Sequence, residues 1–474
     1  MAYRYGDRTQ RVLFPPSVED YVSADDPVRA YDALVEALDF EGLGIPLDPH
    51  QVGNSEYDPK AMLKLLVYGY SYGIRSSRKL ERALYHNVSF MWLTGGLKPD
   101  HKTIAEFRRS HKTALRNVLR QCARLCIEMD LMDGNTLFVD GSKVRANASI
   151  NSSWTRERGL KQLEKIDERI SAILSECESV DESEASGSSL VRMKQDLADR
   201  ERRRAKVGGI LEALDSEGKT SINVTDRECT KIHGRQGAHA GYNVQSVVDD
   251  KHGLIVSSDV TNENNDLHQF AKQMEHAHET LEKTCQTACA DAGYSNVDEL
   301  EKVEGQGVRV IVPSSRQASE KTPGPFDASA FSYHREQDTY TCPQGHVLTY
   351  SHTNEQKQHR IYRIGGSTCR NCPHHGECSR NPRGRTITRS LKAEVAEKLA
   401  AQYEHPDGQA VYQRRKEKVE LPFGHIKHNL AVTGFLLRGL GGVNAEAAIL
   451  STCFNMARMI GILGVTALIA KLAR

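Results

Sequence analysis

Three acidic residues lie where a metal-dependent enzyme needs rigid carboxylates: Asp140, Asp291 and Glu420. Asp140 follows the apolar run Leu137–Val139, and Asp291 follows Thr287–Ala290. Short apolar runs predict buried strands, so both aspartates are expected at strand ends, held in place but open to solvent. Carboxylate oxygens so placed suit Mg²⁺. Taken alone, a strand-end aspartate is more often a turn or capping residue.

A second group with metal-binding chemistry is a set of cysteines in which a C-x2-C motif has a further cysteine on each side: Cys342, Cys369, Cys372 and Cys378. Closely spaced thiolates of this kind predict a zinc site, and additional candidate ligands are His346, His374 and His375. Zinc held by four protein ligands is structural, because no position is open to water. The alternative is a set of free surface cysteines.

The elements that position the acids follow from apolar periodicity. Strands are expected at 137–139, 241–249, 254–260, 287–290 and 308–312, with a helix after 266. The order strand, two strands, helix, strand, strand is that of a ribonuclease-H-like core. In this fold Asp140 and Asp291 end neighbouring strands, and Glu420 enters from a late helix. Three converging carboxylates repel one another unless divalent cations bind there.

The sequence therefore predicts an α+β multidomain protein with a ribonuclease-H-like mixed-sheet catalytic core. The expected parts are a helical N-terminal DNA-binding domain, 1–130, the core, 131–313 and 396–474, a helical-hairpin insertion, 151–225, and a small cysteine-rich, zinc-ribbon-like insertion, 314–395. Helical three-and-four spacing identifies the first insertion.

Two polar residues are expected to begin helices. Asp266, after Asn265, precedes an apolar helical face, and we assign it to capping rather than catalysis. Asn444 follows a glycine-rich break, Gly439–Gly442, and is expected to cap the strongly apolar segment Ala445–Leu463.

The N-terminal region reads as short helices, one of them starting at Asp58-Pro59. Another is expected to run on from about Thr103, with a basic outer face whose candidate DNA contacts are Arg108, Arg109, Lys112 and Arg116. Short helices ending in a basic member suit DNA docking, because neutralising phosphates supplies most non-specific affinity. A solvated helix face explains the same charges about as well.

Composition limits the other possibilities. The chain has 63 basic and 62 acidic residues, a net charge of +1, so bulk charge by itself predicts no polyanionic partner. Met1–Gln10 is polar and lacks the core of a signal peptide, and the apolar end, Ala447–Arg474, is interrupted by Arg458 and Lys471. We expect a cytoplasmic protein with no membrane partner.

Several motifs together resemble bacterial insertion-sequence DDE transposases, with the group numbered eleven-eighty-two as the nearest likeness. They are Phe138-Val-Asp-Gly-Ser142, Gly241-Tyr-Asn-Val-Gln245, Asp291-Ala-Gly-Tyr-Ser295, Val419-Glu-Leu-Pro-Phe-Gly-His-Ile-Lys427, Tyr57-Asp-Pro-Lys60 and His101–Arg108. The resemblance covers nearly the whole chain. It implies that Asp140, Asp291 and Glu420 form the catalytic triad.

The resemblance further implies the reaction and the partners. Two Mg²⁺ or Mn²⁺ ions per active site, about 4 Å apart, would support phosphodiester cleavage and strand transfer. The substrate implied is double-stranded DNA with terminal inverted repeats, bound by a homodimer or higher oligomer. Two alternatives remain: a catalytically inactive, transposase-derived DNA-binding repressor, or another metal-dependent nuclease.

Related families carry Tyr-x2-Arg-x3-Glu-x6-Lys on the last catalytic helix. Glu420 and Lys427 keep that spacing, whereas Lys416 stands at the arginine position and Gln413 at the tyrosine position. Lys416 and Lys427 are expected to contact DNA.

The helical register selects Glu420 over Glu417 as the third acid. An expected apolar stripe comprises Tyr412, Val419, Phe423, Ile426 and Leu430. Glu420 lies at the edge of that stripe, and Glu417 points to solvent. Pro422 is expected to kink the helix or restart it.

Overall fold

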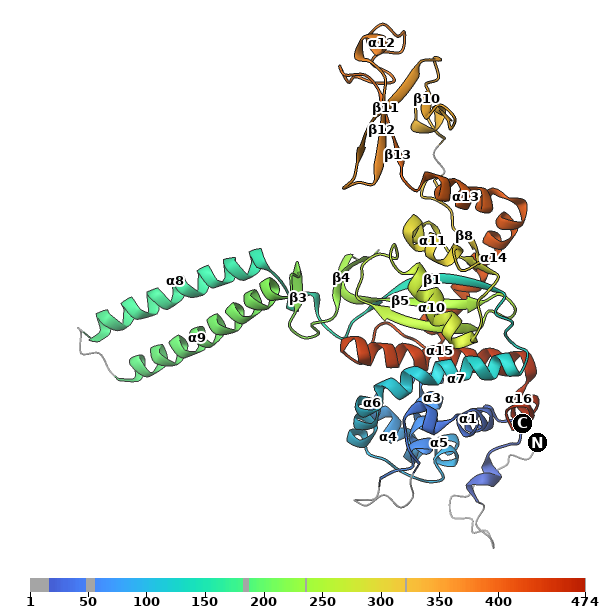
Figure 1. Cartoon of the computed structure of the whole chain (residues 1–474). Coiled ribbons are helices and arrows are strands. Elements are labelled where there is room, and N and C mark those ends of the chain that lie inside the picture. The colour runs from blue at the N-terminus through green and yellow to red at the C-terminus, as the bar shows by residue number, and fades with distance from the viewer. Residues whose placement is uncertain (1–16, 48–55, 182–186, 235–236, 320–321, 474) are drawn as a thin grey trace, which may run out of the picture. The chain divides into compact units, whose positions relative to one another are not determined.

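A computed structural model of the chain describes residues 17–47, 56–181, 187–234, 237–319 and 322–473 (Figure 1). The described chain forms two compact units. The first contains the chain up to Asp266, then Lys272–Cys285, and everything from Lys416 onward, and the second contains Leu267–Ala271 and Gln286–Arg415. The polar start, Met1–Gln10, lies outside the described residues.

The first unit begins with short helices: η1 Val18–Tyr21, α1 Pro27–Glu36, α2 Phe40–Leu43, α3 Pro59–Ser71, α4 Ser77–His86, α5 Val88–Leu93, α6 His101–Ser110 and α7 Lys112–Glu128. The start of α3 is as predicted, since the Asp58 carboxylate accepts the Lys60 backbone N–H at 2.9 Å. The single helix expected from Thr103 is wrong. It is interrupted at His111, where Ser110 and His111 bring their side chains to the last carbonyls of α6 and compete with helix continuation.

The sheet of the first unit is antiparallel. Strand β5, Gly237–Asp249, pairs with β1, Thr136–Arg145, on one side and with β6, Ile255–Thr261, and β4, Thr230–Gly234, elsewhere along its length. The expected end of β1 at Asp140 is wrong. Asp140 lies in mid-strand opposite Ser246, because the polar residues after it continue the strand pairing as far as Arg145.

The core of the first unit is built around α15, Gly439–Leu463, which packs against α3, α7 and β6 (Figure 1). Leu119, Ile255 and Phe454 bring α7, the sheet and α15 into one buried cluster. Among the described residues α15 is the one helix long and apolar enough to cross a membrane, but 67 % of its most apolar window is buried inside the fold. It therefore has the burial of a core helix. A last helix, α16, covers Val465–Leu472.

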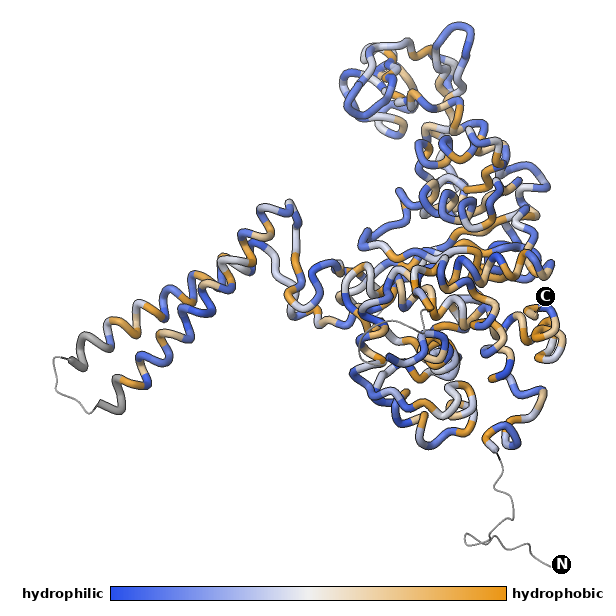
Figure 2. The backbone as a smooth tube through the Cα atoms, turned by 60° about the horizontal axis from the view of Figure 1, so that its bottom comes forward, coloured by the Kyte–Doolittle hydropathy of each residue, from blue (hydrophilic) through white to orange (hydrophobic). Residues whose placement is uncertain are grey.

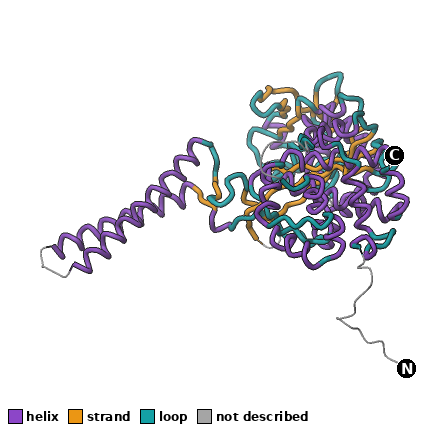
Figure 3. Tube along the Cα trace, turned by 90° about the horizontal axis from the view of Figure 1, so that it is seen from below, coloured by secondary structure: helices purple, strands orange, loops and turns teal. Residues whose placement is uncertain are grey.

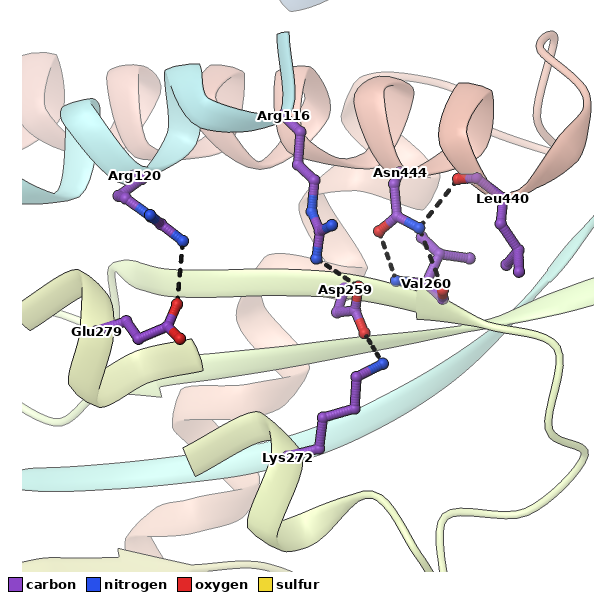
Figure 4. A network of polar contacts seen from close by, with 8 residues as sticks. All are labelled: Arg116, Arg120, Asp259, Val260, Lys272, Glu279, Leu440 and Asn444. Atoms are coloured by element: carbon purple, nitrogen blue, oxygen red, sulfur yellow. Dashed lines mark hydrogen bonds and ion pairs between the residues drawn. The ribbon is translucent and has the colours of Figure 1, made fainter. Parts of the chain in front are cut away.

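We had expected Asn444 to cap the helix α15, but Asn444 lies inside this helix. The helix already begins at Gly439. The Asn444 side chain accepts the Val260 backbone N–H at 2.8 Å and donates to the Val260 carbonyl at 3.2 Å (Figure 4). Asn455 makes the same pair of bonds to Ile255. Two asparagines of α15 thus satisfy backbone groups of β6.

A long antiparallel helical hairpin lies between β1 and β4. It consists of α8, Arg156–Asp181, and α9, Gly187–Ser216, which run side by side from the small strand pair β2, Ser153–Thr155, and β3, Ser221–Asn223 (Figure 3). Hydrophobic and hydrophilic residues alternate along both helices (Figure 2). Ile166, Ile173 and Val207 are among the buried residues of the hairpin.

The second unit contains a parallel strand pair and a separate antiparallel sheet. Strands β7, Thr287–Cys289, and β8, Arg309–Ile311, are parallel and are joined through η3, Ala292–Tyr294, and α11, Val297–Glu304. The antiparallel sheet has the order β13-β12-β11-β10-β9. Its elements are η4 Ala328–Ala330, β9 Ser332–His334, β10 Thr339–Thr341, β11 Val347–Asn354, β12 His359–Arg363, α12 Gly366–Arg370 and β13 Thr386–Ser390. The protein thus combines helices with both parallel and antiparallel pairing.

The remaining helices are η2 Ile150–Ser152, α10 Phe270–Leu281, α13 Ala393–Glu404, α14 Pro406–Gly424 and the π-helical turn η5 His425–Asn429. Of the two outcomes expected at Pro422, a kink or a restart of the helix, the restart does not occur, since α14 continues through Pro422 as far as Gly424. The wider π turn follows directly.

Candidate active site

Asp140 lies at a partly exposed position of a strand whose preceding residues, Leu137–Val139, are fully buried. Side chains of a strand alternate between its faces, so Ser142 lies on the same face as Asp140. The Lys427 ammonium donates to the Ser142 hydroxyl at 2.5 Å. This contact brings Lys427 to the Asp140 side of β1. Burial lowers the pKa of Lys427 below its usual value, and the negative charge of Asp140 opposes that shift.

The segment that carries Lys427 is fixed by apolar packing. Val419 and Leu430 are buried, and Phe423 and Ile426 pack against core clusters. The expected stripe is therefore present over these positions. Glu420 and Glu417 are both exposed, so burial does not distinguish them.

Asp291 belongs to the second unit and follows β7 by two residues, as predicted. Its carboxylate accepts the Gly293 backbone N–H at 2.8 Å and caps η3. Its other oxygen lies 4.0 Å from a guanidinium nitrogen of Arg415. Sequence reasoning missed this arginine. Tyr412 and Arg415 keep the Tyr-x2-Arg spacing one residue upstream of the register set by Glu420, and the Arg415 guanidinium stacks 5.4 Å from the Tyr412 ring centre.

Asp266 does not cap α10, which begins four residues later at Phe270. Instead its carboxylate accepts hydrogen bonds from the Asn243 amide at 2.7 Å, the Gln245 amide at 2.6 Å and the Lys143 ammonium at 3.2 Å. Asn243 and Gln245 are completely buried. The polar residues of the Gly-Tyr-Asn-Val-Gln motif thus fix Lys143 on the face of β1 opposite Asp140.

The basic residues of α6 and α7 have different environments. Arg108 is buried and donates to the Tyr70 hydroxyl at 3.0 Å and to the Arg75 carbonyl at 2.8 Å. This placement corrects the expectation that Arg108 contacts DNA, because its guanidinium is used inside the helical domain. Arg109 is exposed and pairs with Glu106. Lys112 is partly exposed.

Arg116 takes part in a polar network on one side of the sheet. It bonds to Asp259 at 3.0 Å, and Lys272 bonds to the other oxygen of the same carboxylate at 2.6 Å (Figure 4). The Arg116 side chain is 46 % exposed, so it remains open to solvent on one side. Lys416 on α14 is exposed.

The four cysteines line one small cavity of about 30 Å³ in the second unit, together with His346, His374 and His375. The Cys342 sulfur accepts the His346 backbone N–H at 3.3 Å, and the Cys369 sulfur accepts that of Arg385 at 3.4 Å. Burial raises the pKa of Cys378. Throughout the described ranges no three His, Cys, Asp or Glu side chains are grouped closely enough to hold a metal ion as they stand.

Comparison with known proteins gives two family matches. Residues 341–460 match the family described as transposase DDE domain, and residues 16–110 match that described as transposase domain (DUF772). The first match includes Glu420 and Lys427, whereas Asp140 and Asp291 precede it.

One solved structure is similar in part, the "Cryo-EM structure of piggyBac transposase synaptic complex with hairpin DNA (SNHP)". It is 7 % identical over 95 % of this chain and 80 % of that chain, with a TM-score of 0.33. No curated protein matches the sequence.

The family matches define a protein of DNA transposition. Both matches support an insertion-sequence DDE transposase, as the motifs predict.

Proposed function

We propose that this transposase cleaves DNA at terminal inverted repeats and transfers the strand, using Asp140, Asp291 and Glu420 in a ribonuclease-H-like core. The observation that carries the proposal is the setting of Asp140. Its carboxylate stands partly exposed in the middle of β1, directly after the buried residues Leu137–Val139, with the Lys427 ammonium held on the same side through Ser142. A rigid carboxylate next to a fixed ammonium group suits the binding of a phosphodiester better than it suits the capping of a turn.

The donor set fits divalent cations of the Mg²⁺ or Mn²⁺ type, because three carboxylates offer hard oxygen ligands. Two such ions, when bound, activate water and stabilise the leaving 3′ oxygen. The chain's own residues supply the positions. Arg415 and the η3 backbone hold Asp291, and the strand pairing of β1 holds Asp140. Arg415 and Glu420 are five residues apart on α14.

For DNA contacts we propose Arg109, Lys112 and Arg116 on the helical domain and Lys416 and Lys427 at the active site. These side chains would neutralise phosphates and fix the register of the duplex without reading its sequence. Because a transposable DNA element has two ends, we propose that the protein acts on DNA as a homodimer or higher oligomer. We propose that it does so in the cytoplasm.

We also propose that the cysteine-rich sheet holds one structural zinc ion at Cys342, Cys369, Cys372 and Cys378. All four thiols face one cavity, and two of them already accept backbone N–H groups, which favours the thiolate form that zinc binds. The thiols have to draw together onto the ion, which the short turns around Cys342 and Cys369 allow.

Cleavage of a labelled duplex carrying the DNA that flanks the gene tests the catalytic proposal. Asp140→Asn and Glu420→Gln should reduce Mg²⁺-dependent cleavage at least 100-fold, because each removes a charged metal ligand, while binding of the duplex persists. Glu417→Gln is the matched control, three residues away on the same exposed helix. If Glu417→Gln lost Mg²⁺-dependent cleavage and Glu420→Gln retained it, Glu417 rather than Glu420 would be the third acid.

A further inference from the structure

An open groove of about 590 Å³ begins where β1 ends. Its lining residues are Arg75, Arg145, Ala146, Asn147, Ala148, Ser149, Ser152, Thr225, Thr433, Gly434, Phe435, Leu436 and Arg438. All of them are described and belong to the first unit, and they include three arginines but no acidic residue. In a chain with a net charge of only +1, this groove, which we name the arginine groove, is a local concentration of positive charge.

Main-chain bonds fix one wall of the arginine groove to the catalytic strand. The Phe435 N–H donates to the Arg145 carbonyl at 2.8 Å, and Gly434 pairs with Arg145 in parallel. Arg75 donates to the Gly434 carbonyl at 2.9 Å and is neutralised by the buried Glu446. Arg75 therefore builds the wall, and its charge is not available to a ligand.

Arg438 supplies charge at the surface of the groove, and Arg145 lies at the start of the groove. Both are exposed. The Arg438 guanidinium is oriented by its Nε, which donates to the Asn147 carbonyl at 3.0 Å, and within the described chain no carboxylate pairs with it. Its two terminal nitrogens thus present the fork that binds a phosphate. Hydroxyl groups of Ser149, Ser152 and Thr433 lie in the same groove.

The groove begins on the strand that carries Asp140. Arg145 follows Asp140 by five residues along β1, and Lys427 contacts Ser142 between them. At about 3.3 Å per residue, Arg145 is roughly 17 Å from Asp140. One strand of a duplex carries a phosphate about every 3.4 Å along its axis, so this span corresponds to about five nucleotides.

We infer that the arginine groove binds the phosphate backbone of the DNA end, about five nucleotides from the phosphate held at Asp140. The inference rests on the proposed function. It adds to that function a protein surface that fixes the position of the DNA end relative to the active site. A phosphodiester strand is the occupant that fits, because the lining of the groove offers guanidinium and hydroxyl donors and no acidic group that would repel it.

Binding is measured with Asp140→Asn protein, which cannot cleave, on a duplex containing the gene-flanking terminal repeat. Arg438→Gln should weaken binding about tenfold, as expected for one charge-assisted phosphate contact, and should lower the salt-dependence slope by about 1. Arg145→Gln should act similarly. Arg203→Gln, an exposed arginine of α9 without a pairing acid among the described residues, is the matched control and should change neither quantity.

The position is tested with single methylphosphonate substitutions along the duplex. An uncharged linkage about five nucleotides from the cleaved bond should weaken the binding of the duplex by the parent protein. The same linkage should not weaken further the binding of the duplex by the Arg438→Gln protein. Suppose that the parent protein binds and cleaves the duplex, and that folded Arg438→Gln and Arg145→Gln show unchanged affinity and an unchanged salt-dependence slope. This result would refute DNA binding by the arginine groove and leave the catalytic proposal intact. A parent that neither binds nor cleaves would overturn the proposed function itself.

Discussion

The buried ion pair between Arg75 and Glu446 makes a sharp prediction about stability. Glu446 is completely buried, and its carboxylate accepts the Arg75 guanidinium at 2.8 Å and the backbone N–H groups of Leu436 and Leu437, each at 2.9 Å. Arg75→Met removes the cation and leaves a buried negative charge with two backbone donors. Breaking a buried pair in this way costs about 3–5 kcal/mol.

The pH dependence identifies the cause. Burial raises the pKa of Glu446 above its ordinary value, and Arg75 opposes that shift. Without Arg75 the pKa of Glu446 rises further, so the folded state takes up a proton that the unfolded state releases. An acid with a raised pKa in the folded state loses stability as the pH rises from its unfolded pKa through its folded pKa. The cost of Arg75→Met should therefore be smaller at pH 5 than at pH 8.

Urea unfolding of each variant at both pH values measures the effect. Adding Glu446→Gln to Arg75→Met removes the stranded charge and should recover part of the loss and most of the pH dependence. Arg82→Met, at an exposed arginine of α4 that pairs with no side chain in the described part of the chain, should stay within about 0.5 kcal/mol of the parent. A cost below about 1 kcal/mol for Arg75→Met, equal at the two pH values, would refute the reasoning.

Three other predictions follow from single contacts. Cys372→Ser should lower bound zinc from about one ion per chain to well below one by metal analysis, because one of four thiolates is lost; a metal-free, folded parent would exclude the site. Arg108→Ala should destabilise the fold by about 2–4 kcal/mol through its two buried hydrogen bonds, without changing the salt slope of DNA binding by the folded fraction. Asn444→Ala should cost about 2–4 kcal/mol in urea unfolding, since it leaves the Val260 N–H and carbonyl without partners; a neutral variant would show that water replaces the amide.

Local patterns in the sequence predicted the elements better than they predicted the polar contacts. Apolar periodicity placed the strand that ends near Asp291 and the buried helix α15, because burial imposes that periodicity. The length of β1 was missed, since Gly141-Ser142-Lys143 has the composition of a turn although these residues pair with β5.

The polar residues failed for a different reason. Asp266 and Asn444 each precede or enter a helix, which favours capping, yet their partners lie elsewhere: Asn243 and Gln245 for the first and Val260 for the second. Partners more than 20 residues away leave no signal in the local sequence. The same holds for Arg108, whose place in a basic helix concealed two bonds to the helical domain.

The most direct test of the central claim concerns the metal at the leaving oxygen. An end duplex in which sulfur replaces the 3′ bridging oxygen at the cleaved bond is incubated with the protein in Mg²⁺ and in Mn²⁺. Because sulfur is a poor ligand for Mg²⁺ and a better one for Mn²⁺, the account predicts cleavage of this duplex only in Mn²⁺, and none by Asp140→Asn in either ion. Equal cleavage in both ions would contradict metal-assisted departure of the 3′ oxygen, and cleavage by Asp140→Asn would remove that carboxylate from the reaction.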